Sequence, residues 1–177
     1  MLRATHERTI LMKRETTGIR GRVVAELFGP DGELRARCET HNLVTAVGDQ
    51  FYAGRAVLSA GLPAQVTGFK LGTGSTPPAK AGAGAALAAY LPGSNRAPDA
   101  GYPTAVAGVA TWRRTFGPGE ATSANPITEA VLVTDAIATD ATSAAAATIC
   151  RALIDGIGSK GEQDTLVVTW AHELVGA

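Results

Sequence analysis

The feature that most constrains this chain is a series of short runs in which apolar and polar residues alternate, with turns rich in glycine and proline between them. Residues 34–40 alternate in this way and follow the apolar run 22–28 across residues 29–32. The Asp-Gly pair in that connection suits a turn with positive φ. Alternation with period two is typical of a strand that buries one face. The two runs therefore predict an antiparallel hairpin.

Five further runs have the character of strands, namely 65–72, 105–116, 127–134, 147–155 and 164–174. The Gly-Pro-Gly turn at residues 117–119 is expected to let 127–134 return beside 105–116. Runs 147–155 and 164–174 are expected to pair across the connection at 156–163.

One segment changes period. Leu43, Val47, Phe51 and Leu58 recur at helical spacing, and Thr45 is placed to cap the amino-terminal end. The sequence thus predicts one helix near residues 45–58.

About seven or more strands with few parallel crossovers predict a mainly β fold, an antiparallel β-sandwich of jelly-roll-like type. A length of 177 residues suits a single domain at 18–177. Residues 1–17 show little periodicity and are interpreted as an extended arm, with a frayed terminus as the alternative. Residues 77–103 are rich in alanine, glycine and proline and predict a long loop with a short helix around 85–90; such loops are usually functional or disordered.

The charge composition argues against nucleic acid and anionic membranes as partners. Lysine plus arginine and aspartate plus glutamate number 16 each, so no net charge attracts either partner. Charged residues make up 18% and hydrophobic ones 45%. A surface poor in charge suits a subunit that neighbours will cover, although a GC-rich genome would also favour alanine and glycine.

Cysteine usage and hydropathy favour synthesis in the cytoplasm. Cys38 and Cys150 are far apart in sequence and are expected to be free thiols. No segment approaches the ~20 apolar residues that span a bilayer. The apolar run at residues 10–12 is too short for a signal peptide.

Several patterns that resemble catalytic or binding motifs are better explained as structure. Residues 72–75 contain two glycines, but prolines follow where a phosphate-binding loop needs a helix. His6, His41 and His172 are not spaced as metal ligands, and no serine lies in a nucleophile elbow. Trp112 and Trp170 are interpreted as core residues. We expect no catalytic residue, cofactor or metal.

One buried ion pair is predicted. Glu129 lies among apolar neighbours in its run, and a buried carboxylate requires a cation or backbone donors. Arg151, in a run expected to neighbour that of Glu129, is the candidate partner.

The order of five segments resembles a family of small virion proteins of tailed bacteriophages. The segments are residues 41–45 (HNLVT) with Gly48, 69–76 (FKLGTGST), 127–130 (ITEA), 151–153 (RAL) and 164–170 (DTLVVTW). The resemblance covers roughly residues 34–174. The chain departs from the pattern at Val131, where the family has glycine, and in the alanine-rich stretch at 77–103.

The resemblance implies a non-enzymatic virion protein built on a β-sandwich. We expect a capsid cement or decoration protein that binds the assembled head, with the major capsid protein as partner and with self-association as a dimer or trimer. A tail or baseplate adaptor for fibre attachment is the first alternative, and a receptor- or carbohydrate-binding module is the second. An enzyme on a β-scaffold is the remaining alternative.

Partner contacts are expected from the arm and from the long loop. The candidate contact residues are Arg3, Arg8, Lys13, Arg14, Tyr90, Arg96 and Tyr102.

Overall fold

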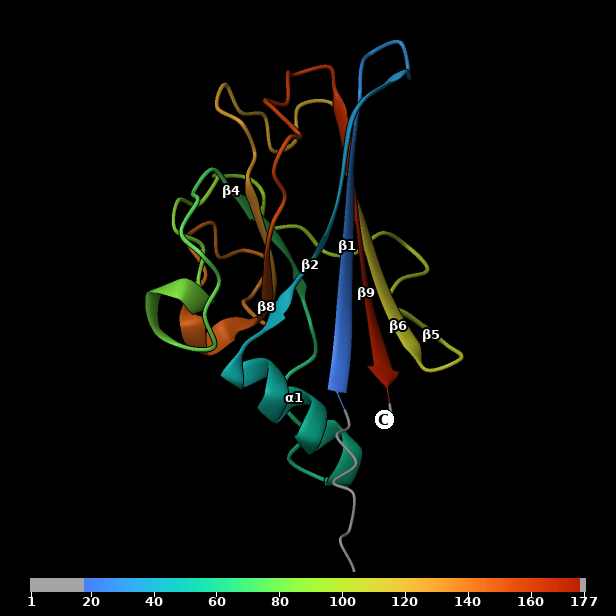
Figure 1. Cartoon of the computed structure of the whole chain (residues 1–177), viewed down its shortest axis with the longest axis vertical. Coiled ribbons are helices and arrows are strands. Elements are labelled where there is room, and N and C mark those ends of the chain that lie inside the picture. Colours follow the sequence, from blue (N-terminus) through green and yellow to red (C-terminus); the bar gives the residue numbers. More distant parts are fainter. Residues whose placement is uncertain (1–17, 176–177) are drawn as a thin grey trace, which may run out of the picture.

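The first and the last strand pair at the centre of one sheet. The computed structural model describes residues 18–175. In it, β1 (Gly18–Phe28) and β9 (Thr165–Val175) have 11 residues each and pair antiparallel along their whole length (Figure 1). This pairing joins the two ends of the described chain.

Two antiparallel sheets contain all nine strands of the described residues. Sheet A has the order β2-β1-β9-β6-β5, and sheet B has the order β3-β8-β7-β4. The remaining bounds are β2 Leu34–His41, β3 Leu43–Val44, β4 Gly68–Gly72, β5 Thr104–Val106, β6 Val109–Phe116, β7 Glu129–Val133 and β8 Thr148–Leu153. The prediction of a mainly β, antiparallel chain with one helix is confirmed, and the arrangement is sandwich-like.

The core lies between the sheets. Val23, Ala25 and Leu27 of β1 belong to the same buried cluster as Ala130 and Leu132 of β7, and they fall on one side of each strand because alternate residues point the same way. Trp112, Phe116 and Trp170 fill the same layer, so the prediction that both tryptophans are core residues is confirmed. Cys38 packs at the core margin and Cys150 inside it, both as free thiols.

The first hairpin is confirmed, but two later pairings were predicted wrongly. β1 pairs with β2 as expected. The runs expected to pair at 105–116 with 127–134, and at 147–155 with 164–174, instead lie in different sheets. β9 pairs with β1, which matches its 11 residues, whereas β8 has 6 residues and lies between β3 and β7. The length and burial of a strand thus decide which strand it pairs with more than its closeness in the sequence does.

Residues 105–116 form two strands and not one. β5 and β6 are joined by Ala107 and Gly108, whose φ values of 48° and 80° are both positive. This backbone fits a two-residue turn of type I′. Alanine is uncommon at such a position, which hid the turn from sequence reasoning.

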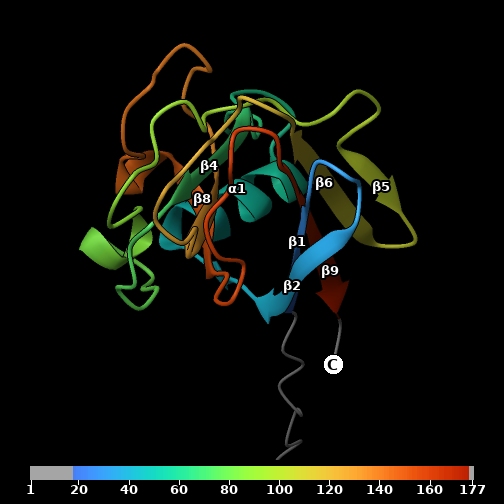
Figure 2. The same ribbon diagram turned by 90° about the horizontal axis from the view of Figure 1, so that it is seen from above.

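The single α-helix of the described chain, α1 (Ala46–Val57), begins where predicted. Thr45 caps it by accepting a hydrogen bond from the Gly48 amide, and the Thr45 hydroxyl also donates to the carbonyls of Thr148 and Ile149 on β8. The helix closes one end of the space between the sheets (Figures 1 and 2). It is too short to span a membrane.

Loops form a further layer over the outer face of sheet B. Segments 73–96 and 134–147 lie beside β4 and β8, on the side away from β1 and β9 (Figure 2). Leu87 and Tyr90 pack there on Val131 and Val133. The predicted short helix at 85–90 is wrong: a 3-10 turn occupies Gly82–Ala85, and residues 89–96 pair with β4 instead.

Removing the Thr45 hydroxyl should loosen this closed end. We expect Thr45→Ala to lower the free energy of unfolding by about 1–2 kcal/mol, because α1 loses its cap and the buried Thr148 carbonyl loses its hydroxyl donor, whereas the Ile149 carbonyl keeps the Thr45 amide. Thr45→Ser keeps the hydroxyl and should retain most of the stability. Urea unfolding of the three proteins measures this; equal losses in both variants would contradict it.

Candidate functional site

A buried ion pair lies on the outer face of sheet B, on its two inner strands β7 and β8. Arg151 Nη2 is 2.6 Å from Glu129 Oε2, and both side chains are fully buried. Arg151 Nε donates to the same oxygen at 3.1 Å. The structure thus brings together the two residues whose pairing the sequence suggested.

The pair fastens the loop layer to the sheet. Glu129 accepts hydrogen bonds from the amides of Gly74, Ala88 and Ala89 at 2.8–3.0 Å. Arg151 donates to the carbonyls of Thr76 and Gly84 at 2.7 and 3.0 Å. A buried charge needs such partners on every side. Segment 74–89 is therefore held by charge-assisted bonds to two side chains of the sheet.

A second buried cation fixes the other loop. Lys70 Nζ is 2.7 Å from Asp135 Oδ2 and donates to the Ala141 carbonyl at 2.8 Å. Asn95 Nδ2 lies within 3.1 Å of the carbonyls of residues 136, 137 and 139, so it ties the two loop segments together. The loop layer is thus a connected part of the fold.

Two of the three candidate contact residues of the long loop, Tyr90 and Arg96, bond to other side chains of the described chain. Tyr90 Oη donates to Asp140 Oδ1 at 2.5 Å. Burial and Asp140 raise the pKa of Tyr90 to about 12. Arg96 pairs with Glu120 at 3.2 Å, and Tyr102 is half-buried. The other four candidates, Arg3, Arg8, Lys13 and Arg14, lie outside the described residues.

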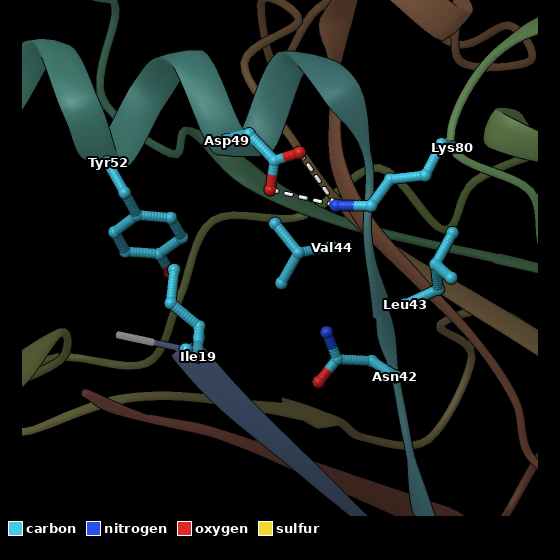
Figure 3. A pocket seen from close by; sticks show the side chains of 8 residues that line it. Ile19, Asn42, Leu43, Val44, Asp49, Tyr52 and Lys80 are labelled. Atoms are coloured by element: carbon cyan, nitrogen blue, oxygen red, sulfur yellow. Dashed lines mark hydrogen bonds and ion pairs between the residues drawn. The ribbon is translucent and has the colours of Figure 1, made fainter. Parts of the chain in front are cut away.

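A hollow of about 430 Å³ lies between the start of β1, β3 and α1 (Figure 3). Its rim carries an exposed ion pair in which Lys80 Nζ is 2.6 Å from Asp49 Oδ2. The Asn42 amide lies on the opposite side, with its nitrogen directed into the hollow (Figure 3). That Nδ2 atom is buried without a hydrogen-bond partner among the described residues.

Behind the hollow, a polar cluster links α1 to sheet A. Tyr52 Oη on the helix contacts His172 Nδ1 on β9, and Trp170 Nε1 donates to His172 Nε2 at 2.9 Å. The Trp112 and His172 rings meet edge to face with centroids 5.5 Å apart. Both imidazole nitrogens therefore have protein partners.

Burial keeps this cluster uncharged. It lowers the pKa of His172 to about 4 and raises that of Tyr52 well above its usual range. Since the indole nitrogen only donates, neutral His172 accepts at Nε2 and carries its proton at Nδ1. Both nitrogens are then committed to Trp170 and Tyr52. The arrangement suits a structural link between helix and sheet more than proton transfer.

Metal ligation finds no support in the described residues. Between residues 18 and 175, no three histidine, cysteine, aspartate or glutamate side chains lie close enough together to hold an ion.

An uncharged apolar surface lies at the carboxyl-terminal end of α1, and we call it the α1-end surface. Val57, Leu58 and Leu62 are 79%, 47% and 44% exposed. They are three of seven large exposed hydrophobic residues in the described chain, and they fall within six positions. The other exposed residues of this surface are Ala53, Ala56, Ser59, Ala60 and Gly61. Such clustering is typical of a surface that contacts another molecule.

The one charge within this stretch is turned inward. Arg55 donates to the Pro63 carbonyl at 2.5 Å, and its guanidinium lies 5.5 Å from the centre of the Phe51 ring. The exposed part of the surface is thus left without charge.

Sequence reasoning missed this surface. It assigned Leu58 to the buried stripe of the helix, but α1 ends at Val57 and Leu58 has an extended backbone. The available signal was the uncharged run 56–64, in which leucines stand beside serine, glycine and proline. Apolar residues next to turn residues seldom all point into a core.

No protein family, curated protein or solved structure matched this chain in comparisons of sequence and fold.

Replacing the buried carboxylate should destabilise the whole chain. Glu129→Gln leaves Arg151 buried without a counter-charge, so we expect the free energy of unfolding to fall by about 3–5 kcal/mol. Glu39→Gln is the matched control, because Glu39 pairs with Arg22 on an exposed face and should barely move the urea midpoint. Similar losses in both variants would contradict the role of the buried pair.

His172 should make stability depend on pH. Its pKa is about 4 in the folded chain against 6.5 when exposed, so protonation favours unfolding. The contribution of neutral His172 to the free energy of unfolding is complete above pH 6.5. It is lost as the pH falls towards 4, which lowers that free energy by about 3 kcal/mol. His172→Gln removes this titration, so its free energy of unfolding should fall less over that window. Identical pH slopes for both proteins in urea titrations would contradict the assignment.

Proposed function

We propose that this chain is a structural protein of a tailed-bacteriophage virion, a capsid cement or decoration protein that binds the assembled head through protein contacts. The observation that carries the binding role is the α1-end surface, where Val57, Leu58 and Leu62 are exposed without neighbouring free charge. Burying such a surface on a partner removes apolar area from water.

The virion assignment is supported by where the segments of the phage-like pattern meet. Residues 69–76, 127–130 and 151–153 surround the pair of Glu129 and Arg151. Thr128 also donates to the Gly74 carbonyl at 2.7 Å. The shared pattern therefore consists of residues that build the fold, as expected for proteins whose function is structural.

The two remaining segments meet beside α1. Asn42 of the first lies 3.2 Å from His172 Nε2, which accepts from Trp170 of the last. Thr45 of the first caps α1. We extend the proposal to a jelly-roll-like sandwich, supported by the pairing of the first and last strands and by four chain crossings between the sheets.

A cement role needs only modest affinity at each site. A protein that binds the assembled shell and not its parts stabilises that shell by about 4 kcal/mol per site at a thousandfold excess over its dissociation constant. A rigid body with an ordered loop layer suits this role, because little conformational freedom is lost on binding.

The location of the protein in particles tests the proposal. A cryo-electron microscopy map of virions from the source of this chain should show many copies on the head surface. A few copies at the tail would favour the adaptor role instead. Particles without the protein would overturn both.

The α1-end surface should make the contact with the particle. We expect Val57→Asp combined with Leu62→Asp to lower the affinity for particles stripped of the protein by tenfold or more, because charges would be buried at the contact. Thermal stability should stay close to that of the unmodified chain, since both residues are exposed. Co-sedimentation with the particles measures the affinity.

Leu34→Asp is the matched control. Leu34 is 50% exposed at the start of β2, at the far end of sheet A from α1 (Figure 1). This variant should bind as the unmodified chain does. Equal losses for Leu34→Asp and the double variant would show that the α1-end surface is not the contact.

A further inference from the structure

Three of the four sheet edges are closed to further strands. β2 carries Arg35, Arg37 and Glu39, and charge at an edge opposes pairing with another chain. β3 has only two residues and leads directly into α1. β4 is covered by the long loop, through bridges from Phe69 to Arg96 and from Gly72 to Tyr90.

The fourth edge, β5, is open. Thr104, Ala105 and Val106 are all exposed, Val106 to 70%, and none carries charge. Within residues 18–175, only β6 pairs with this strand. An uncovered, uncharged strand edge is a template for another strand.

The turn decides which backbone groups of β5 point outward. Val106 and Val109 flank the two-residue turn at residues 107–108 and are therefore a hydrogen-bonded pair. Bonded and non-bonded pairs alternate along an antiparallel ladder, so Thr104 also bonds to β6 while Ala105 does not. The N–H and C=O of Ala105 point to the open edge.

We propose that β5 pairs antiparallel with β5 of a second copy, about a two-fold axis at Ala105. Each Ala105 N–H then donates to the Ala105 carbonyl of the other copy, and Thr104 lies opposite Val106. The same surface serves both copies, which is the usual geometry of a closed dimer. Since β5 carries no charge, the two-fold axis brings no like charges together, as it would on β2.

The second copy is favoured over an unrelated strand because the edge is self-complementary and very short. Pro103 precedes β5 and lacks an N–H, so pairing cannot extend beyond it. A contact this small is weak and transient in solution. When a particle holds many copies close together, the same contact gains from their high effective concentration. The dimer does not depend on the virion role.

Sedimentation velocity of the full chain tests the proposal. Between about 5 and 500 µM the protein should shift from its monomer mass of 18.1 kDa towards twice that mass. A chain that stays monomeric across this range overturns the proposal.

Substitutions at Ala105 identify the surface. Ala105→Lys sets two like charges opposite each other across the axis and should weaken association at least tenfold. Ala105→Glu should do the same, and an equimolar mixture of the two variants should associate again as a heterodimer. Ala105→Val keeps the N–H and lacks charge, so it should associate as the unmodified chain does. If the charged variants associate normally, or if their mixture stays monomeric, β5 is not the contact.

Discussion

The pairing of Glu129 with Arg151 constrains the rest of this structure more than any other contact. Two full charges lie on the outer face of sheet B, where a sandwich ordinarily meets water, and neither reaches solvent. Burial of this kind is tolerated only when every donor and acceptor finds a partner. The backbone of segment 74–89 supplies those partners, so the requirement for satisfied charges dictates the path of a loop that its own alanines and glycines could not specify.

The same requirement explains why the outer face of sheet B is covered by loops while that of sheet A is not. Lys70 requires Asp135 and a carbonyl of the second loop, which brings residues 134–147 over the same face. Sheet B is therefore covered, and its edge at β4 is occupied by residues 89–96. Among residues 18–175, the outer face of sheet A carries no comparable buried charge, and Arg22 and Glu39 pair there in contact with water. The surfaces that remain for partners thus lie on sheet A and at α1.

Local signals in the sequence predicted local structure well. The hairpin of β1 and β2 follows from an Asp-Gly turn between alternating runs, and the start of α1 follows from Thr45. The pair of Glu129 and Arg151 was predictable because a carboxylate within an apolar strand demands a cation. The hairpin and the helix start need no knowledge of which strands are neighbours, and the ion pair needs only that the runs of Glu129 and Arg151, which follow one another in the chain, lie side by side.

Non-local structure was not predictable in the same way. β9 lies beside β1 and not beside β8, a choice set by matched length and by burial between two sheets. The turn at residues 107–108 has alanine at its first position of positive φ, so Gly108 alone did not mark it as a two-residue turn. The exposure of Leu58 depends on where α1 ends, and the apolar pattern runs past that point. The surfaces proposed for contact are thus the features that a pattern-based analysis most readily assigns to the core.

The two proposed contacts lie on separate elements whose relative position is fixed. α1 is joined to sheet B through Thr45 and to sheet A through Tyr52 and His172, so the helix cannot shift without breaking buried hydrogen bonds. β5 is joined to β9 through β6. A copy held to a surface by α1 would therefore present β5 in a defined direction. A copy that is already bound through α1 loses no further conformational freedom when its β5 meets a neighbouring copy. Weak contacts between neighbours can therefore add along a regular lattice.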